Sequence, residues 1–526
     1  MIPQSAVKEF LSRPLRDLRE WKKLTDTEIQ AKCDALPIHP PIWRKLSRTQ
    51  KICFLVGAKY KAVFMVKDTG MGKSLLSIAL IKYFAKLKHN KRVLVLVPNL
   101  GNKDEWSLEI EKHSPITKHL ILEGSSKDKW GHLEDTDALI VIETYAGLMK
   151  MVTTKVKAKR SKKFKLQPDK NLIKKLLQKI DGLVMDESTL ASTRGKLPFR
   201  ICRQIAKKAS IRFALAGMPF GRDPTPLWGQ MYLIDQGETL GKTLGLFRAA
   251  FFTAKDNYWG GTDYTFDQRK MGLLHRTLAH SAIRFKAREA DLPRVVPITK
   301  NLVLPESTSA YFEKAKKALI DAKGDFSMMN NAFLRMRQIS SGWIGYKDDT
   351  EGRKAEFEFA DNPKLEALLE TIDTIDPADK ILIFHDFVFS GSIIARELDA
   401  RKIKYVRLWH GTKDVKAIRK QFDEDPDTRI FILNSAGAFG LNLQIAKYGL
   451  FFERLVSVIL YTQIRRRIER QFSAHDRIFL YDFVTKNTMD DRIIRFHSEG
   501  KALFDGIVEG KAGLSFIKQM RILDGL

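Results

Sequence analysis

The chain has 526 residues, 44% of them hydrophobic, which is enough for roughly three domains with buried cores. Lys and Arg number 91 against 62 Asp and Glu, a formal net charge of +29. This excess favours a polyanionic partner, and we expect nucleic acid rather than a merely solvated basic surface. No apolar run is long enough to span a membrane, and residues 1–23 lack the apolar stretch of a signal peptide. The three cysteines have neither metal-ligand nor disulfide spacing, so we expect a cytoplasmic protein with reduced thiols.

Short β-rich runs alternate with helical patterns along the chain. The first series is AVFMV (62–66), RVLVLVP (92–98), ALIVIET (138–144), GLVMDE (182–187) and RFALAG (212–217). The second series is KILIFH (380–385), KYVRLW (404–409), RIFILN (429–434), YGLFFE (448–453) and RIFLYDF (477–483). Apolar strands that alternate with helices indicate buried parallel sheets built from βαβ units. The alternative is one large α/β domain with an insertion, but two groups of strands favour two α/β domains.

The predicted organisation therefore has two α/β lobes separated by a helical segment. Its parts are an N-terminal helical extension (1–44), lobe 1 (45–236), a helical insertion or linker (237–360), lobe 2 (361–500) and a C-terminal tail (501–526). Within lobe 1, the stretch KVKAKRSKKFK (155–165) has too few apolar residues to bury a core. We predict a flexible basic loop over 150–180 that contacts phosphates, and a localisation signal is the alternative interpretation.

The segment VFMVKDTGMGKSLLSIAL (63–80) places a glycine-lysine-serine between a predicted strand and a predicted helix. This is the context of a phosphate-binding loop, where backbone N–H groups and the helix N-terminus face the phosphates. Lys73 would reach the β- and γ-phosphate oxygens, and the Ser74 hydroxyl would bind Mg²⁺. Lys67 occupies the position where the general pattern has its first glycine, which argues against a generic phosphate-loop kinase. The predicted nucleotide-binding residues are Thr69, Gly70, Met71, Gly72, Lys73 and Ser74.

An acidic pair, Asp186 and Glu187, follows the predicted strand GLVM. The first carboxylate can hold Mg²⁺ through water, and the second can orient and activate the attacking water. An isolated acidic pair at a strand end could equally cap a helix. The order of phosphate loop, apolar strand and acidic pair favours the catalytic interpretation.

A third motif lies near the other end of the chain, in YTQIRRRIERQ (461–471). Gln463, Arg467 and Arg470 fit the pattern Q-x-x-x-R-x-x-R. Arginines three residues apart lie on one helical face, so they can converge on a γ-phosphate bound by another domain. A basic helix lying on nucleic acid is the alternative, and Arg465 and Arg466 are available for that role.

These pieces, in this order, resemble the superfamily 2 helicase-like ATPases and, within them, the Snf2 group of double-stranded DNA translocases. The resemblance covers nearly the whole chain. Besides the phosphate loop and its upstream segment LSRTQ, it is carried by VLVLVPNLGNKDEW, LAGMPFGRDPTPLW, HRTLAHSAIRFKAREADLP, LRMRQISSG, NPKLEALLE, ILIFHDF, SAGAFGLNL and LYDFVTKNTMDDRI.

The resemblance implies two RecA-like lobes with Mg²⁺ and ATP held between them. In that family Gln50 would read adenine, and Gly440 would also contact the nucleotide. The implied activity is a DNA-stimulated ATPase that moves along double-stranded DNA, forked or branched DNA included, in replication, recombination or repair. We expect a monomer on DNA with no membrane partner, in a bacterial or virus-infected host cytoplasm.

Several positions depart from the family pattern. Lys67 replaces the small residue that opens the family's phosphate loop, and Arg466 replaces a glycine. Ala216 and Met218 stand where the motif LTGTP has hydroxyl side chains, which puts the usual coupling contacts of that motif in question. Ser188 and Thr189 follow the acidic pair in place of alanine and histidine.

Three alternatives remain open at the level of sequence. A strand-separating or fork-remodelling DNA helicase shares every motif. An RNA helicase is also possible, but the motifs of this chain do not have the sequences typical of RNA helicases. A nucleic-acid binding module without productive ATPase is disfavoured by the intact Lys73, Asp186, Glu187 and Arg470.

Overall fold

The computed structural model divides into two units, which are described separately. Its described residues up to 286 form unit 1, and those from 293 onward form unit 2. The described ranges are 2–68, 70–88, 92–157, 164–221, 223–256, 261–286, 293–322, 326–347, 354–409, 412, 414–434, 443–469 and 475–498.

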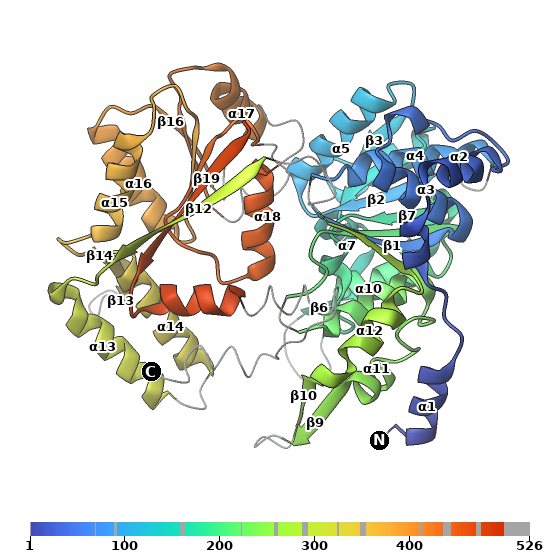
Figure 1. Cartoon of the computed structure of the whole chain (residues 1–526), viewed down its shortest axis with the longest axis horizontal. Helices are drawn as coiled ribbons and strands as arrows, with labels where there is room; N and C mark the ends of the chain where they lie inside the picture. Colours follow the sequence, from blue (N-terminus) through green and yellow to red (C-terminus); the bar gives the residue numbers. More distant parts are fainter. Residues whose placement is uncertain are drawn as a thin grey trace. The chain divides into compact units, whose positions relative to one another are not determined.

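Unit 1 is built on a seven-stranded sheet in the order β11-β1-β8-β7-β2-β4-β3, with every neighbouring pair parallel (Figure 1). Its strands are β1 (Ala62–Lys67), β2 (Val93–Val97), β3 (His119–Ile121), β4 (Ile140–Thr144), β7 (Gly182–Met185), β8 (Ile211–Ala216) and β11 (Ala282–Phe285). The residues of β2, β4 and β7 are all buried, as expected for strands covered on both faces. All five strands predicted for this lobe are confirmed.

Helices flank the sheet of unit 1. They are α1 (Gln4–Ser12), α2 (Asp26–Asp34), α3 (Arg48–Tyr60), α4 (Lys73–Lys86), α5 (Leu100–His113), α6 (Ser126–Asp135), α7 (Tyr145–Met151), α8 (Lys170–Lys179), α9 (Leu197–Ala206), α10 (Thr225–Asp235), α11 (Leu244–Phe251) and α12 (Met271–Leu278). Single 3-10 turns are η1 (Leu18–Lys23), η2 (Trp43–Lys45), η3 (Ser188–Ala191) and η4 (Gln268–Lys270). The main core packs α3, α4 and α5 on Val63, Met65 and the odd-numbered residues of β2.

Unit 2 has a six-stranded sheet in the order β12-β19-β18-β15-β17-β16, again wholly parallel. Its strands are β12 (Arg294–Leu302), β15 (Ile381–Phe384), β16 (Tyr405–Leu408), β17 (Ile430–Leu433), β18 (Tyr448–Phe451) and β19 (Arg477–Thr485). Its helices are α13 (Glu306–Asp321), α14 (Phe326–Ser340), α15 (Pro363–Thr374), α16 (Val388–Ala400), α17 (Val415–Glu424) and α18 (Val458–Ile468). The five strands predicted for the second lobe are confirmed, and the chain has the predicted architecture of two RecA-like lobes.

The domain boundaries differ from the predicted ones at 236/237 and 360/361. The segment 237–360 contains helices, but it also supplies β11 to the sheet of unit 1 and β12 to the sheet of unit 2. It further contains two hairpins, β9 (Phe252–Asp256) with β10 (Thr262–Phe266) and β13 (Trp343–Lys347) with β14 (Lys354–Glu358). Residues 1–44 are helical as predicted, yet Leu18, Ile29 and Trp43 are buried in the main core of unit 1 rather than forming an extension.

The flexible basic loop predicted over 150–180 is wrong for the described part of that segment. Strands β5 (Thr153–Lys157) and β6 (Phe164–Pro168) form an antiparallel ribbon, and α8 follows with Asp169 as its N-cap. Ile173 and Leu176 anchor α8 because their side chains are buried, which a count of lysines does not reveal. The helices among the described residues include none long and apolar enough to cross a membrane. The predicted C-terminal tail lies outside the described residues.

Candidate active site

The phosphate loop connects the end of β1 to the start of α4, as the sequence predicts. Gly70 and Gly72 both have positive φ, 86° and 63°. At Gly72 a Cβ atom would lie 2.2 Å from Nε2 of Gln50, so a larger residue would have to displace this amide and also adopt a strained positive φ. The loop is therefore shaped by glycine at the point where the helix begins. Thr69 lies outside the described residues.

Lys73, at the start of α4, and Glu187, after β7, meet at the carboxyl edge of the sheet, although β8 separates β1 from β7. The Lys73 Nζ atom lies 3.9 Å from Oε1 of Glu187 and donates a hydrogen bond of 3.2 Å to the carbonyl of Lys67. The side chains of Lys73 and Glu187 are each only 10% exposed. A phosphate that reached Lys73 would thus lie beside a nearly buried carboxylate, which is the arrangement that hydrolysis by an activated water requires.

Asp186 is held in place by two aromatic residues. Trp106 donates its indole N–H to Oδ2 of Asp186 at 3.0 Å, and the Tyr145 hydroxyl donates to the Asp186 backbone carbonyl at 3.0 Å. Burial raises the pKa of the Tyr145 phenol well above its usual range, so the hydroxyl stays protonated and can donate. Glu187 follows in the left-handed region with φ 47°, an uncommon conformation for a residue with a side chain. Sequence reasoning did not assign either aromatic to the acidic pair.

The oxygen donors near the loop suit Mg²⁺. Ser74 and Asp186 offer a hydroxyl and a carboxylate, and Mg²⁺ commonly takes one or two such ligands together with waters and substrate phosphates. Among the described residues no group of three or more His, Cys, Asp or Glu side chains could hold a metal ion. Ser74 and Asp186 stay the predicted Mg²⁺ ligands of this site.

Gln50 connects α3 to the phosphate loop. Its Oε1 accepts the Ser47 N–H at 2.7 Å, closing a capping box at the start of α3, and its Nε2 donates to the Gly72 carbonyl at 2.9 Å. The amide thus fixes the loop from the side of α3. The adenine contact implied by the family stays a prediction.

Lys67, the main departure in the loop, turns its side chain away from Lys73. Its Nζ donates to Oγ1 of Thr49 at 3.0 Å and lies 5.4 Å from the centre of the Phe285 ring. The side chain is fully buried. The Lys67 backbone carbonyl still accepts the hydrogen bond from Lys73, so a large residue at position 67 is compatible with this contact of the loop.

A buried amide links the acidic pair to the turn after β8. The Ser188 hydroxyl donates to Oε1 of Gln230 at 2.7 Å, and Nε2 of Gln230 donates to the Pro219 carbonyl at 2.6 Å. Gln230 is fully buried in α10. This link lies in the region where Ala216 and Met218 replace the hydroxyl residues of the family motif. It could not be predicted from the sequence, because it depends on how α10 packs.

The arginine motif belongs to unit 2. Gln463 and Arg467 lie on α18 and are buried, and the Arg467 carbonyl accepts the Leu443 N–H at 3.3 Å. Arg465 pairs with Glu469 within the helix region at 3.2 Å. The helix is fixed to β19 because the Tyr461 hydroxyl donates to Oδ2 of Asp482 at 3.1 Å. Arg470 and Gly440 lie outside the described residues, and so does the side chain of Arg466.

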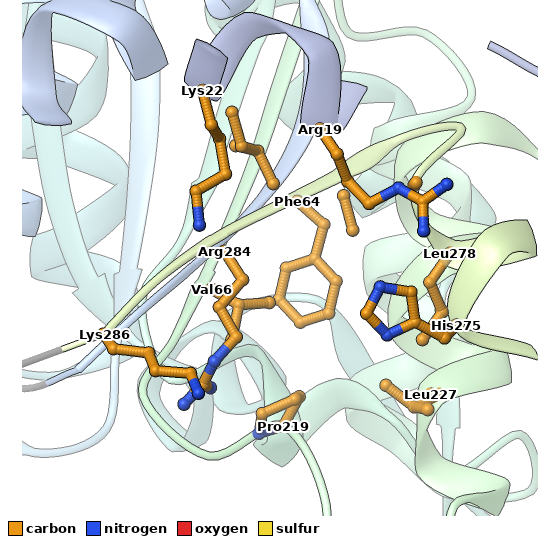
Figure 2. A pocket seen from close by; sticks show the side chains of 13 residues that line it. Arg19, Lys22, Phe64, Val66, Pro219, Leu227, His275, Leu278, Arg284 and Lys286 are labelled. Carbon is orange, nitrogen blue, oxygen red and sulfur yellow. The ribbon is translucent and has the colours of Figure 1, made fainter. Parts of the chain in front are cut away.

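A cavity of about 310 Å³ lies on the other face of β1 from the phosphate-loop helix. Figure 2 shows Phe64 and Val66 against it, with His275 across from Lys22. The lining is apolar and basic and includes no carboxylate, so it offers no ligand for Mg²⁺. The cavity is distinct from the candidate active site, because none of the predicted site residues lines it. Its lining residues are Arg19, Lys22, Phe64, Val66, Pro219, Leu227, His275, Leu278, Ala279, Ala282, Ile283, Arg284 and Lys286.

Residues 48–334 match the family model of the SNF2-related domain, which is more than half of the chain. The chain therefore belongs to the SNF2-related family and carries its ATPase core, and the resemblance predicted from the motifs is confirmed.

Known relatives extend the match beyond lobe 1. Protein p41 of Acyrthosiphon pisum secondary endosymbiont phage 1 is 25% identical over 467 residues, covering 84% of this chain and 93% of that protein. SWI/SNF chromatin-remodeling complex subunit snf22 of Schizosaccharomyces pombe is 21% identical and covers 85% of this chain and 27% of that protein. Nuclear protein STH1/NPS1 of Saccharomyces cerevisiae is 22% identical, with 85% and 34% covered. The chain thus spans only about a quarter of the length of the first of these yeast relatives and about a third of the second.

Among solved structures, the SWI2/SNF2 ATPase core of Sulfolobus solfataricus in complex with double-stranded DNA is similar. The identity is 20%, the TM-score is 0.38, and 88% of this chain and 93% of that chain are covered. The same core domain without DNA has a TM-score of 0.36 and 19% identity, with 90% of this chain and 93% of that chain covered.

Proposed function

We propose that the protein is a DNA-dependent ATPase that moves along double-stranded DNA. The observation that carries the proposal is the approach of Lys73 to Glu187, 3.9 Å apart at the strand ends of a chain in the SNF2-related family. A binding module without catalysis has no need of a nearly buried acid beside the phosphate-loop lysine.

Each group has a defined role in this proposal. Lys73 would bind the β- and γ-phosphate oxygens, and Ser74 and Asp186 would hold Mg²⁺, which would neutralise charge on the phosphates. Glu187 orients the attacking water and accepts its proton. Trp106 and Tyr145 keep Asp186 in one orientation, so little reorganisation is needed during the reaction. Arg467 and Arg470 are proposed to stabilise the negative charge that develops on the γ-phosphate.

DNA is the proposed partner because of the charge of the chain. A net charge of +29 supports binding driven by counterion release from phosphates, which positions the protein without reading sequence. We propose a role in replication, recombination or repair in the cytoplasm of a bacterium or an infected host. Remodelling of forked DNA is the second candidate function, and the ribbon described below favours it.

The test is the ATPase rate measured side by side with fully paired DNA, single-stranded DNA, forked DNA and RNA. We expect strong stimulation by DNA that contains a duplex and weak stimulation by RNA. The variant Glu187→Gln keeps the shape of the site and should lose about 10² to 10⁴ in turnover, the range for a lost general base. Equal rates with and without DNA, or stimulation by RNA alone, would contradict the proposal.

A further inference from the structure

The ribbon formed by β5 and β6 carries apolar side chains on both of its faces. In its antiparallel register Lys155 is opposite Leu166, and Val156 is opposite Lys165. Side chains of directly opposed residues share a face and alternate along each strand. Phe164 and Leu166 therefore lie on one face with Lys155, whereas Val156 and Lys165 lie on the other.

These apolar side chains are open to solvent. Phe164 is 67% exposed, Leu166 is 42% exposed and Val156 is 41% exposed. The other ribbon of unit 1 behaves differently, because its opposed pair Phe252 and Phe266 is buried at 9% and 3% exposure. An isolated two-stranded ribbon is only marginally stable in water, and clustered exposed apolar residues commonly mark a binding surface.

The charge around the ribbon restricts the kind of partner. Asp169 is the only acidic residue between positions 153 and 179, and its side chain caps α8. The exposed lysines of this segment are Lys155 and Lys165 on the ribbon, and Lys170 and Lys174 on the helix α8 that follows it. Such a surface repels a basic partner and attracts a polyanion.

An exposed aromatic side chain among lysines fits a nucleic acid whose bases are accessible. Lysines bind the backbone phosphates, and an aromatic ring stacks on the flat face of any unpaired base. Fully paired DNA hides those faces inside its stack, so on such DNA only the lysines could contribute. The combination of Phe164 with its lysines therefore distinguishes unpaired from paired DNA.

We propose that Phe164 stacks on an unpaired base while the ribbon lysines bind the flanking phosphates. The protein then binds forked or otherwise partly unpaired DNA in preference to a fully paired duplex. This inference rests on the proposed function and adds to it the preferred DNA structure and the residue that recognises it.

The test compares dissociation constants of the full chain for DNA of one length, either fully paired or with a central unpaired bubble. We expect the wild-type chain to bind the bubble more tightly. Phe164→Ala should weaken bubble binding by roughly 5- to 150-fold, the range found when a base-stacking aromatic is removed, and should leave duplex binding nearly unchanged. Phe164→Trp should keep the preference, whereas Phe164→Leu, which is apolar but not flat, should lose it.

The matched control is Ile116→Ala, which removes an 87% exposed apolar side chain from unit 1 outside the ribbon and should change neither constant. A fluorescent adenine analogue in the bubble should be quenched by the wild-type chain and not by Phe164→Ala. Circular dichroism confirms that each variant is folded.

Two results would overturn the inference. An equal loss on bubble and duplex would place the ribbon in a groove of paired DNA, which admits a two-stranded ribbon. Unchanged affinity of Phe164→Ala for both DNAs would indicate that the apolar face binds a protein partner instead. The wild-type ATPase rate on fully paired DNA separates the two proposals. Without duplex stimulation the proposed function fails, and with stimulation but no bubble preference only the ribbon inference fails.

Discussion

The two units share one architecture, a wholly parallel sheet flanked by helices, but they hold their charged groups differently. In unit 1 the ends of β1 and β7 bring Lys73 within 3.9 Å of Glu187, and neighbouring aromatics fix Asp186. In unit 2 the arginine motif lies on α18, which is tied to β19 through Tyr461 and Asp482. Unit 1 thus brings the candidate phosphate-site residues together at one sheet edge, whereas in unit 2 the motif residues Gln463 and Arg467 are buried on α18. This difference predicts that changes in unit 1 abolish nucleotide chemistry outright, while changes in unit 2 slow it after the nucleotide has bound.

The largest expected effect is that of Lys73→Ala. Removing the ammonium group leaves the phosphates without their main cation and Glu187 without its nearest positive neighbour. We expect ATP turnover to disappear, while DNA binding without nucleotide survives because the basic surface is separate. Turnover is measured by phosphate release and DNA binding by anisotropy. ATP turnover of Lys73→Ala above about a tenth of the wild-type rate would show that this loop is not the catalytic phosphate loop.

The second-largest expected effect is that of Arg470→Ala, which tests the arginine motif. Arg470→Ala should keep nucleotide affinity within a few-fold and lower turnover by roughly 10³, the scale seen when an arginine finger is lost. The matched control is Arg465→Ala, because Arg465 is already paired with Glu469 at 3.2 Å and should not reach the phosphate. Affinity is measured with a fluorescent ATP analogue and turnover by phosphate release. Near-normal hydrolysis in a folded Arg470→Ala chain would reduce this helix to a DNA-contacting surface.

Most of the sheet and the centre of the site could be predicted from the sequence. The ten predicted strands are all present because each is a short apolar run that is buried in a parallel sheet. The approach of Lys73 to Glu187 follows from the same topology, since the carboxyl ends of parallel strands meet at one edge of the sheet. The roles of these residues stay predictions, as does the role of Arg470.

The remaining features could not be predicted because they depend on pairing and packing. Strand β12 lies at a sheet edge and is largely exposed, and Pro297 interrupts its short apolar run, which disfavours the prediction of a strand. Strand β11 is only four residues long and follows a helical pattern. Helix α8 did leave a signal, an N-cap Asp169 before apolar residues at helical spacing, but the lysine content of the segment obscured it.

A smaller effect is expected from Gln230→Leu, which tests a link inside unit 1. The change keeps the volume of the side chain but leaves the Ser188 hydroxyl and the Pro219 carbonyl without their hydrogen bonds to it. Each buried unsatisfied group costs about 1–3 kcal/mol, so the urea midpoint should fall. The stimulation of turnover by DNA should fall as well, while basal turnover is retained.

The control is Gln236→Leu at the end of α10, where the amide makes only a long contact of 3.4 Å to the Tyr232 carbonyl. An unchanged midpoint for Gln230→Leu would mean that this link contributes nothing to the fold.

The smallest effect on chemistry is expected from the exposed lysines of the ribbon and of α8, which belong to unit 1 but lie outside its candidate active site. Lys155, Lys165, Lys170 and Lys174 are exposed and take part in none of the contacts around Lys73. Changing all four to Gln should weaken binding to every DNA sequence alike, because phosphate contacts carry no sequence information. The slope of log affinity against log salt should fall by about 0.9 for each phosphate of duplex DNA that the variant no longer neutralises. Maximal turnover at saturating DNA should be unchanged, since these lysines act before the nucleotide reacts.

The control replaces Lys314 and Lys317, two exposed lysines of α13 in unit 2, and should leave the slope as it is. An unchanged slope in the ribbon variant would show that its lysines are merely solvated, and a fall in maximal turnover would show that the ribbon and the active site are coupled within unit 1.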